Sequence, residues 1–472
     1  MHLKKILIVV SLVFISIIAC KKEKFFTDAG AKLEFSVDTV QFDTVFTTIG
    51  SATQSFKVYN PYNKSIKLSS ISLAKGDNSF FRLNINGVST RRITNVEMEA
   101  NDSIYIFVEV HVDPNNTNNP MIVQDSIVFE TNGTFQDVKL VAVGQDVNLI
   151  NGDDASGTIS TNTTWNNLKP YLVYNSMLVD SNVILSISSG TKIYFHHGSR
   201  MYVKGTLNAI GSVPEPIIFR NDRLEHWYDD VPGQWVGIYF VSGSKDNRLD
   251  FCEIKNAIIG IQADTVANTN YTVEISNSKI LNMNAVGIFG QGTNIKAGNC
   301  VIANCGQYAL ALTIGGSYEF YHCTIYNSWA YANRQTPSLV LNNYYQDVNG
   351  NYHVRPLNNA IFGNCIIYGS LENEIVFDSF NSSSTFNYKF INSLVKIADT
   401  VTTTNFAHWQ NIYKNQLPGI KSPSTSDFSL DTLAYAKDKG DITIGSYYIS
   451  DILGNPRTYL PDLGAYERQD NK

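Results

Sequence analysis

The chain has 472 residues, of which 17% are charged and 12% aromatic, with 31 glycines and a formal net charge of −6. This length allows two or three domains, and the composition is typical of a β-rich extracellular protein rather than a helical cytosolic one. Because the chain is mildly acidic, bulk charge argues against capture of a polyanion, and no nucleic-acid partner is expected.

The first twenty residues have the features of a secretion signal. Two lysines precede an uncharged apolar run over residues 6–18, and Ala19 and Cys20 follow. The run is too short to span roughly 30 Å of hydrocarbon, and a small residue before a cysteine resembles the lipobox of bacterial lipoprotein signal peptides. That resemblance implies a signal peptide over residues 1–19 and acyl chains on Cys20. Several acyl chains would anchor the protein stably in the outer membrane or at the cell surface.

Residues 20–30 are predicted to be the lipidated cysteine and a polar tether, and residues 31–148 a β-sandwich. Short runs in the second stretch alternate apolar and polar side chains, as strands with one buried face do. These runs include residues 33–37, 55–59, 103–112 and 125–129. Residues 42–46, 59–61 and 141–145 resemble the hydin-like immunoglobulin-fold domains of bacterial surface proteins. The resemblance implies an Ig-like fold and says little about activity.

The pattern changes near residue 150. Apolar strands of three to six residues then alternate with glycine-marked turns, as in residues 190–195, 201–211 and 235–240. This pattern resembles the opening coils of bacterial right-handed parallel β-helix proteins, the class that includes pectate lyases. It implies a solenoid over residues 149–445, followed by a C-terminal closing segment over residues 446–472 that acts as a final strand and cap.

Internal repetition is the strongest signal in the chain. Five segments align, namely residues 273–280, 295–302, 318–325, 360–367 and 388–395. Their fifth position is Asn277, Asn299, His322, Asn364 or Asn392; their sixth is Ser278, Cys300, Cys323, Cys365 or Ser393; their eighth is Ile280, Ile302, Ile325, Ile367 or Val395. The eighth positions are 22, 23, 42 and 28 residues apart. The interval of 42 residues is either one coil with an insertion or two coils.

Each repeated position has a physical reason. The sixth and eighth positions share parity along a strand, so both should point into the coil. Stacked asparagines at a turn can join their amides from coil to coil, and Asn282, Asn304 and Asn327 form a second aligned row. The repeated cysteines are therefore predicted to be packing residues rather than redox or zinc-binding groups, and His322 a structural residue.

Enzymes with this fold act in a groove on an outer face of the coils. Hydrolases need two or three carboxylates at a fixed separation, and lyases need a base and usually calcium held by carboxylates. No acids are expected at matching positions of neighbouring coils, because the aligned segments carry asparagine, serine and cysteine. No catalytic residue and no metal ligand is assigned, and calcium is the one cofactor that the sequence leaves open.

The first candidate site is the loop over residues 225–230, which combines Trp227, Tyr228, Asp229 and Asp230 with a histidine. It is either a platform for a sugar ring or a calcium ion, or a solvated loop with a packed tryptophan.

The second candidate is the insertion over residues 329–356, which contains Trp329, Tyr331, Tyr344 and Tyr345. Long loops that leave a solenoid often carry function, and aromatic faces stack on sugar rings. The alternative is a loop that folds back and covers the coil with its own aromatic side chains.

The sequence therefore predicts an all-β envelope lipoprotein, with an Ig-like β-sandwich followed by a right-handed parallel β-helix. It is predicted to bind glycans or other extracellular ligands without catalysing a reaction. Its expected partners are the membrane, through the lipid on Cys20, and an extracellular polysaccharide. A polysaccharide lyase or glycoside hydrolase with an unfamiliar site is the first alternative, because fold alone does not fix function. A purely structural envelope protein is the second.

Overall fold

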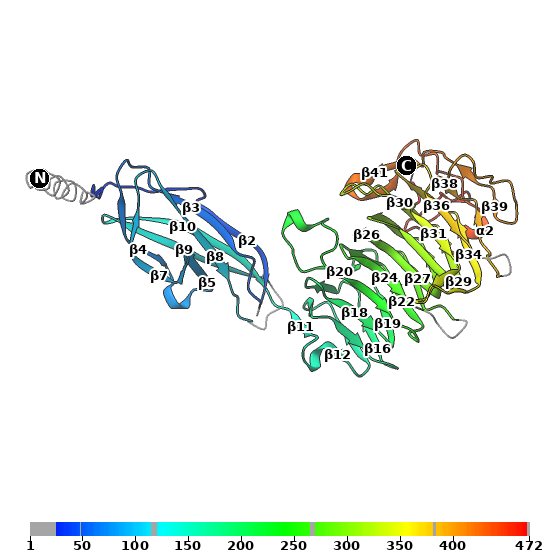
Figure 1. Ribbon diagram of the computed structural model, residues 1–472, viewed down its shortest axis with the longest axis horizontal. Coiled ribbons are helices and arrows are strands. Elements are labelled where there is room, and N and C mark those ends of the chain that lie inside the picture. The colour runs from blue at the N-terminus through cyan, green and yellow to red at the C-terminus, as the bar shows by residue number, and fades with distance from the viewer. Residues whose placement is uncertain (1–24, 48, 115–119, 265–269, 381–383, 470–472) are drawn as a thin grey trace, which may run out of the picture. The chain divides into compact units, whose positions relative to one another are not determined.

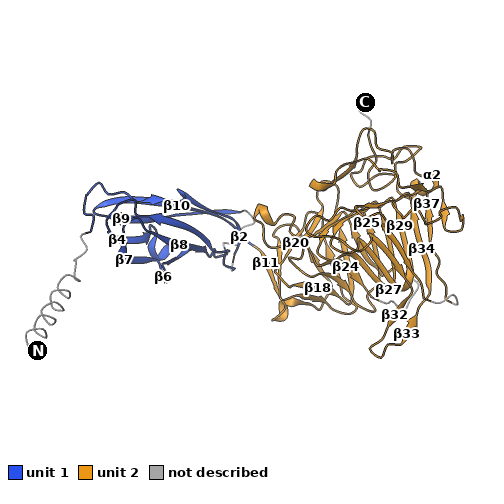
Figure 2. Ribbon diagram, turned by 45° about the horizontal axis from the view of Figure 1, so that its top comes forward, with its two compact units in different colours: residues 1–146 blue, residues 147–472 orange. Residues whose placement is uncertain are grey.

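The computed structural model describes residues 25–47, 49–114, 120–264, 270–380 and 384–469. The chain divides into two compact units, Met1–Asp146 and Val147–Lys472 (Figures 1 and 2). The predicted signal peptide and Cys20 lie outside the described residues. Within the described ranges, no helix is both long enough and apolar enough to cross a bilayer.

The first unit is a β-sandwich of two five-stranded sheets. One sheet contains, in spatial order, β1 (Glu34–Phe35), β3 (Gln54–Tyr59), β8 (Ser103–Val110), β5 (Phe81–Ile85) and β6 (Val88–Thr90). The other contains β2 (Thr39–Phe46), β10 (Thr134–Gln145), β9 (Met121–Thr131), β4 (Ile66–Leu73) and β7 (Arg92–Met98). The predicted β-sandwich is confirmed.

Alternation and turn chemistry explain these sheets. Strands such as β8 and β10 alternate buried and exposed side chains, and the buried set forms one core. Asn86-Gly87 and Asn132-Gly133 close the β5–β6 and β9–β10 hairpins, and all four residues have positive φ. Two consecutive residues with positive φ are the signature of the type I′ turn, whose twist matches that of the paired strands.

The second unit is a parallel β-helix with two long sheets. The 11-stranded sheet contains β11 (Asn148–Asn151), β14 (Tyr171–Tyr174), β17 (Lys192–Phe195), β20 (Ile217–Asn221), β23 (Cys252–Lys255), β26 (Lys279–Met283), β28 (Val301–Cys305), β30 (Thr324–Asn327), β35 (Ile366–Gly369), β38 (Leu394–Val395) and β40 (Tyr413–Lys414).

The 17-stranded sheet supplies the remaining faces of the coils. It contains β12 (Thr158–Ile159), β13 (Thr163–Trp165), β15 (Met177–Val179), β16 (Ile184–Ile187), β18 (Arg200–Val203), β19 (Thr206–Ile210), β21 (Gly237–Phe240), β22 (Asn247–Asp250), β24 (Ile259–Ala263), β25 (Val273–Ser276), β27 (Val286–Gly298), β29 (Leu310–Tyr321), β31 (Leu339–Asn342), β34 (Leu357–Gly363), β36 (Ile375–Asp378), β37 (Lys389–Ile391) and β39 (Trp409–Gln410). The predicted order of a sandwich followed by a parallel β-helix is confirmed.

Outside these sheets, a β-hairpin joins β32 (Tyr344–Gln346) to β33 (Tyr352–Val354), and a second joins β41 (Ile420–Ser422) to β42 (Asp427–Leu430). The short helical turns are η1 (Gly76–Asn78), η2 (Ala155–Gly157), η3 (His226–Tyr228), η4 (Pro423–Thr425) and α2 (Ile442–Gly445).

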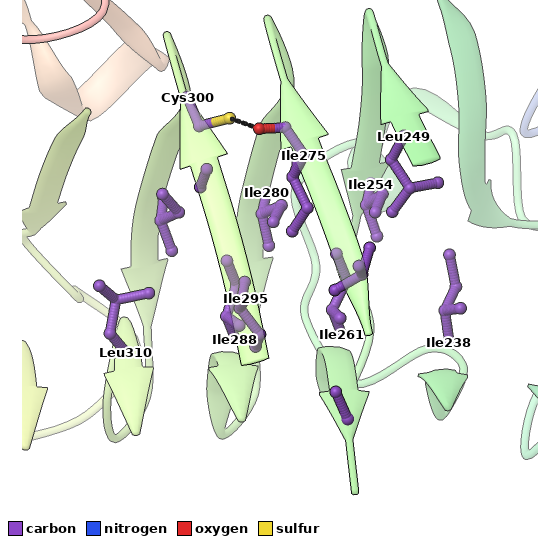
Figure 3. Packing of buried hydrophobic residues seen from close by; sticks show 14 of the residues in the cluster. Ile238, Leu249, Ile254, Ile261, Ile275, Ile280, Ile288, Ile295, Cys300 and Leu310 are labelled. Carbon is purple, nitrogen blue, oxygen red and sulfur yellow. Dashed lines mark hydrogen bonds between the residues drawn. The ribbon is translucent and has the colours of Figure 1, made fainter. Parts of the chain in front are cut away.

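The interior of the β-helix is a set of aliphatic rows. Ile238, Ile261, Ile288 and Leu310 are partners on four successive coils, and each is almost fully buried (Figure 3). Parallel pairing puts the same position of neighbouring coils about 4.8 Å apart, so each side chain packs on its equivalents above and below. Burial of these rows is the main favourable term for the solenoid, because one coil cannot bury its own apolar face.

The aligned segments behave as the repeat predicts. Every residue at the sixth and eighth positions is completely buried. The Cys300 thiol donates to the carbonyl oxygen of Ile275 on the preceding coil at 3.6 Å (Figure 3). Strand β30 pairs directly with β35, so the interval of 42 residues is one coil with an insertion.

The fifth position is where each coil turns. Its five residues all have φ between 43° and 53°, a left-handed conformation that asparagine and histidine tolerate better than most residues. The predicted amide ladder is present in part. Asn299 donates to Asn277 at 3.0 Å, and Asn364 donates to Nε2 of His322 at 2.9 Å. Burial holds the pKa of His322 well below its usual value, so this ring is neutral and structural.

The rest of that ladder is replaced by the C-terminal segment. Arg457 donates to the Asn299 side chain at 2.7 Å, and just before the segment the backbone N–H of Asp441 donates to the side-chain oxygen of Asn364 at 2.7 Å. Apolar side chains of the segment, such as Leu463 and Tyr466, pack on the outer face of the 11-stranded sheet. The prediction of a final strand and cap is wrong in this respect, because the described part of the segment adds no strand to either long sheet and covers a side face.

We predict that the five cysteines between Cys252 and Cys365 do not react with a thiol reagent in the folded protein. All five are buried and free, and burial raises the pKa of Cys305 to about 12. Since the thiolate is the reactive form, Ellman's reagent should label none natively and five after unfolding in guanidinium, measured on a chain that begins at residue 21. Rapid native labelling of any of the five would contradict the packing role.

Candidate functional site

A long open groove lies on the outer face of the 17-stranded sheet. Its larger part has a volume of about 1290 Å³, and a neighbouring hollow of about 480 Å³ shares Arg248, Glu274 and Glu319 with it. The two hollows together are called the outer groove below. Its floor is formed by β22, β25, β27 and β29, and its walls come from the hairpin insertion and the C-terminal segment.

A row of alternating charges runs across this floor. Arg248 pairs in register with Glu274, Glu274 with Lys296, and Lys296 with Glu319. The flanking strand residues Leu249 and Ile275 are buried, so the charged side chains leave the sheet on its solvent face, as the twofold period of a strand requires. Four successive coils therefore present one charged group each at the same position.

The two cations of the row interact with groups other than the two glutamates. Arg248 forms an ion pair with Asp250 on its own strand at 3.5 Å, and the Lys296 ammonium lies over the Tyr271 ring, 5.6 Å from its centroid. Both glutamates line the outer groove, and the Glu319 carboxylate interacts there with the hydroxyls of Tyr271 and Tyr321.

Two tyrosines lie beside Glu319. Burial and the carboxylates of Glu319 and Glu274 raise the pKa of Tyr271 to about 12. Burial and Glu319 also raise the pKa of Tyr321. An anionic neighbour disfavours ionisation of a phenol, so both hydroxyls keep their protons at neutral pH and remain hydrogen-bond donors.

One wall of the outer groove comes from residues that follow α2. Tyr447 is exposed at the rim, and Tyr448 lies across the coil at Gly298. A methyl group at position 298 would overlap the Tyr448 ring, so a glycine is needed for this close approach. Arg457 holds the segment in place, because it contacts Asn299 and forms a buried ion pair with Glu467 at 3.2 Å.

The other wall comes from the insertion. In the β32–β33 hairpin, Tyr345 stacks on His353 with ring centroids 4.9 Å apart and lines the outer groove with Arg355. Tyr344 points to the opposite face, where its hydroxyl donates to Asp378 at 3.0 Å. Of these two predicted tyrosines, one therefore lines the groove and the other fixes the hairpin to the coil.

The backbone beneath the groove is strained at one point. Ile314 has φ 61°, and Gly315 and Gly316 follow with φ 71° and 111°. This is where β29 stops pairing with β31 and begins to pair with β34. A left-handed conformation is a true outlier for a β-branched residue and costs roughly 1–3 kcal/mol. Such strain is concentrated at functional sites in proteins, and Ile314 lines the outer groove.

The loop over residues 225–230 lies elsewhere, and its acids are already paired. Asp229 contacts Arg220 at 3.2 Å and His226 at 3.0 Å. Asp230 contacts Lys255 at 3.1 Å.

The aromatic residues of this loop differ in exposure. Tyr228 lies under Arg223, whereas Trp227 is 64% exposed.

Within the described ranges, no group of three or more histidine, cysteine or acidic side chains is placed to hold a metal ion.

The start of the insertion meets this loop. The Tyr331 hydroxyl donates to the Asp230 carbonyl oxygen at 2.8 Å, and the Trp329 and Tyr331 rings lie 5.1 Å apart. The structure therefore brings together the 225–230 loop and the first part of the insertion, while Tyr345 alone of the eight predicted residues lines the outer groove.

Sequence reasoning missed the charged row. Glu274, Lys296 and Glu319 are the second residues of three aligned segments. In this row the acids alternate with a lysine, so they recur on every second coil and not on neighbouring coils.

Comparisons with known proteins give no family. No protein-family model and no curated protein matches the chain. Among solved structures, the catalytic unit of a GH87 α-1,3-glucanase from Streptomyces thermodiastaticus aligns with 77% of this chain and 89% of its own, at 10% identity and a TM-score of 0.24. A family 123 glycoside hydrolase from Clostridium perfringens aligns over 23% of each chain, at 9% identity and a TM-score of 0.17. Scores this low carry no argument about activity.

We predict that Arg457→Met destabilises the β-helix unit by about 3–5 kcal/mol, since it leaves the buried Glu467 carboxylate without its partner. Chemical denaturation followed by tryptophan fluorescence measures the effect. The double variant Arg457→Met/Glu467→Met should recover part of the loss, and Arg355→Met, at an exposed arginine, should stay within about 0.5 kcal/mol of wild type. Equal stability of Arg457→Met and Arg355→Met would show that the C-terminal wall is held by other contacts.

Proposed function

We propose that this chain is a lipid-anchored protein of the cell envelope that binds an extracellular glycan along the outer groove. The observation that carries the proposal is the outer groove itself, in which carboxylates, cations, amides and tyrosines line one open surface. Ligand sites commonly combine apolar or aromatic walls with a few convergent polar groups.

The lining suits a polyhydroxylated ligand. Sugar hydroxyls can donate to Glu274 and Glu319 and can accept from Arg248 and Lys296, and the Tyr345 face can cover the apolar side of a pyranose ring. Three acidic and three basic side chains line the outer groove, namely Asp246, Glu274, Glu319, Arg248, Lys296 and Arg355. This balance favours recognition of hydroxyl groups over capture of a polyanion by net charge.

The repeat of the coils suits a polymer. Equivalent side chains recur about every 4.8 Å along the solenoid, which is close to the length of one pyranose in an extended glycan. A chain laid across the coils would meet one charged group per sugar. Anchoring through Cys20 would place the outer groove where extracellular polysaccharide is present, and the outer membrane or cell surface is the proposed location.

We predict that a native gel with an embedded mixed-linkage β-glucan, dextran or polygalacturonate slows the migration of the protein in at least one case. Tyr345→Ala should raise the apparent dissociation constant for that polysaccharide by about 5- to 30-fold. This is the effect of losing an interface anchor worth roughly 1–2 kcal/mol. Trp227→Ala, at an exposed aromatic outside the outer groove, is the matched control and should bind as wild type does.

Two results would count against this function. Unchanged migration in all three gels would contradict glycan binding and favour a purely structural envelope protein. Loss of binding in Trp227→Ala but not in Tyr345→Ala would move the site to the 225–230 loop.

A further inference from the structure

We propose that His353 positions the Tyr345 ring at the wall of the outer groove, and that loss of the His353 proton weakens glycan binding. This inference rests on the proposed glycan binding and assigns a regulation to the same site. It differs from a passive wall because the affinity then depends on pH through a side chain that does not itself line the outer groove.

The two faces of the β32–β33 hairpin are held in different ways. Antiparallel pairing puts Tyr345 opposite His353, and adjacent residues of a strand point to opposite faces. On the other face, the Tyr344 hydroxyl donates to Asp378 of the coil at 3.0 Å. That contact fixes the hairpin to the solenoid, so the orientation of the Tyr345 ring depends on what lies beside it on its own face.

The His353 ring sets the plane of the Tyr345 ring. The two ring planes are 15° apart, and their centroids are separated by 4.9 Å. Within the described ranges, no other aromatic ring stacks on Tyr345. A ring stacked on one face of a tyrosine leaves the opposite face for a sugar, so His353 is a positioning residue for the proposed platform.

The Asp347 carboxylate holds the histidine from the tip of the hairpin. One of its oxygens lies 2.8 Å from Nε2 of His353, and the other accepts the backbone N–H groups of Asn349 and Asn351 at 2.9 Å each. The hydrogen bond with His353, followed by that from the Asn351 backbone, holds the pKa of Asp347 below its usual value. The carboxylate is therefore ionised at every pH at which an imidazole titrates.

Protonation of His353 strengthens its contacts with both neighbours. An imidazolium forms an ion pair with the Asp347 carboxylate, and a cation over the Tyr345 face is attracted by the ring electrons. A neutral imidazole keeps the stacking and one hydrogen bond but loses the ionic part. An ordinary imidazole titrates near about pH 6.5. The Tyr345 ring is thus held most firmly below that pH, and the hold weakens as the pH rises through it.

The other charged groups around the hairpin do not replace this pair. Asp378 lies on the opposite face, where it accepts the Tyr344 hydroxyl. Arg355 follows His353 on the same face, two residues or about 7 Å along the strand, and opposes a positive charge there. Since Coulomb energy falls with distance, the carboxylate in contact with His353 at 2.8 Å outweighs it.

The test measures affinity for whichever of mixed-linkage β-glucan, dextran and polygalacturonate retards the protein, by titration calorimetry at about pH 5.5 and about pH 8, on either side of an ordinary imidazole titration. Wild type should bind about 2- to 5-fold more weakly at the higher pH, the size of effect expected for a partly exposed ion pair and a stacked cation. His353→Phe keeps a ring against Tyr345 without a charge and should bind equally at both. Asp347→Asn keeps an acceptor for the turn and should lose most of the difference.

A matched control and a ligand-free measurement complete the test. His226 pairs with Asp229 at 3.0 Å in a loop outside the outer groove, so His226→Phe should keep the pH dependence of wild type. Carbon-13 NMR of labelled histidines follows His353 without any glycan, and its signal is assigned by its absence in His353→Phe. Asp347→Asn should lower the pH at which this signal titrates, because a carboxylate favours the protonated imidazole.

The outcomes separate this regulation from the binding function. Equal wild-type affinity at both pH values, or a pH dependence that His353→Phe retains, would refute the role of His353 and leave glycan binding intact. An unchanged His353 titration in Asp347→Asn would show that the carboxylate does not hold the ring. Absence of retardation by all three polysaccharides would refute the binding function, and this regulation with it, however His353 titrates.

Discussion

The structure of the second unit depends on the parallel register between successive coils. Backbone hydrogen bonds fix equivalent residues next to each other, and in the five aligned coils a left-handed asparagine or histidine at the turn returns the chain to the same position. Once this register is set, a residue type that suits the interior of one coil suits the next, and buried rows of isoleucine and cysteine result. The cysteines are therefore part of the packing rather than separate chemical groups.

The same register also orders the outer surface. A side chain that points to solvent on one coil has equivalents above and below it, so an exterior row is as regular as an interior one. In the row that contains Glu274 and Glu319, charge alternates and the acids recur on every second coil. A solenoid thus converts a repeat of about twenty residues into functional groups at fixed separations. That property suits recognition of a polymer whose own units repeat.

The outer groove needs more than the solenoid, because its walls come from segments that leave the coil. Tyr448 reaches the coil at Gly298 because Arg457 and Glu467 hold the C-terminal segment against the asparagine row. Tyr345 reaches the groove from a hairpin inserted within one coil. The rigid register supplies the floor, and two irregular segments supply the aromatic sides.

The order of a sandwich followed by a β-helix, the inward rows and the turn asparagines were all predictable from sequence, because each follows from a short periodic pattern. The walls were not, since Gly298 and Tyr448 are 150 residues apart and only the folded chain brings them together. Tyr344 and Tyr345 could be predicted as a pair but not separated, because the pairing of the hairpin decides which one faces the groove. Glu274 and Glu319 were visible in the alignment and were overlooked because a lysine lies between them.

Hydroxyl-radical footprinting of the full chain, with and without the polysaccharide that it retains, tests most directly whether the outer groove is the binding surface. Binding in the outer groove predicts slower oxidation of Tyr271, Tyr345 and Tyr447 in the complex, with Trp227 unchanged. Protection confined to Trp227 and its neighbours, or to the β-sandwich, would contradict it.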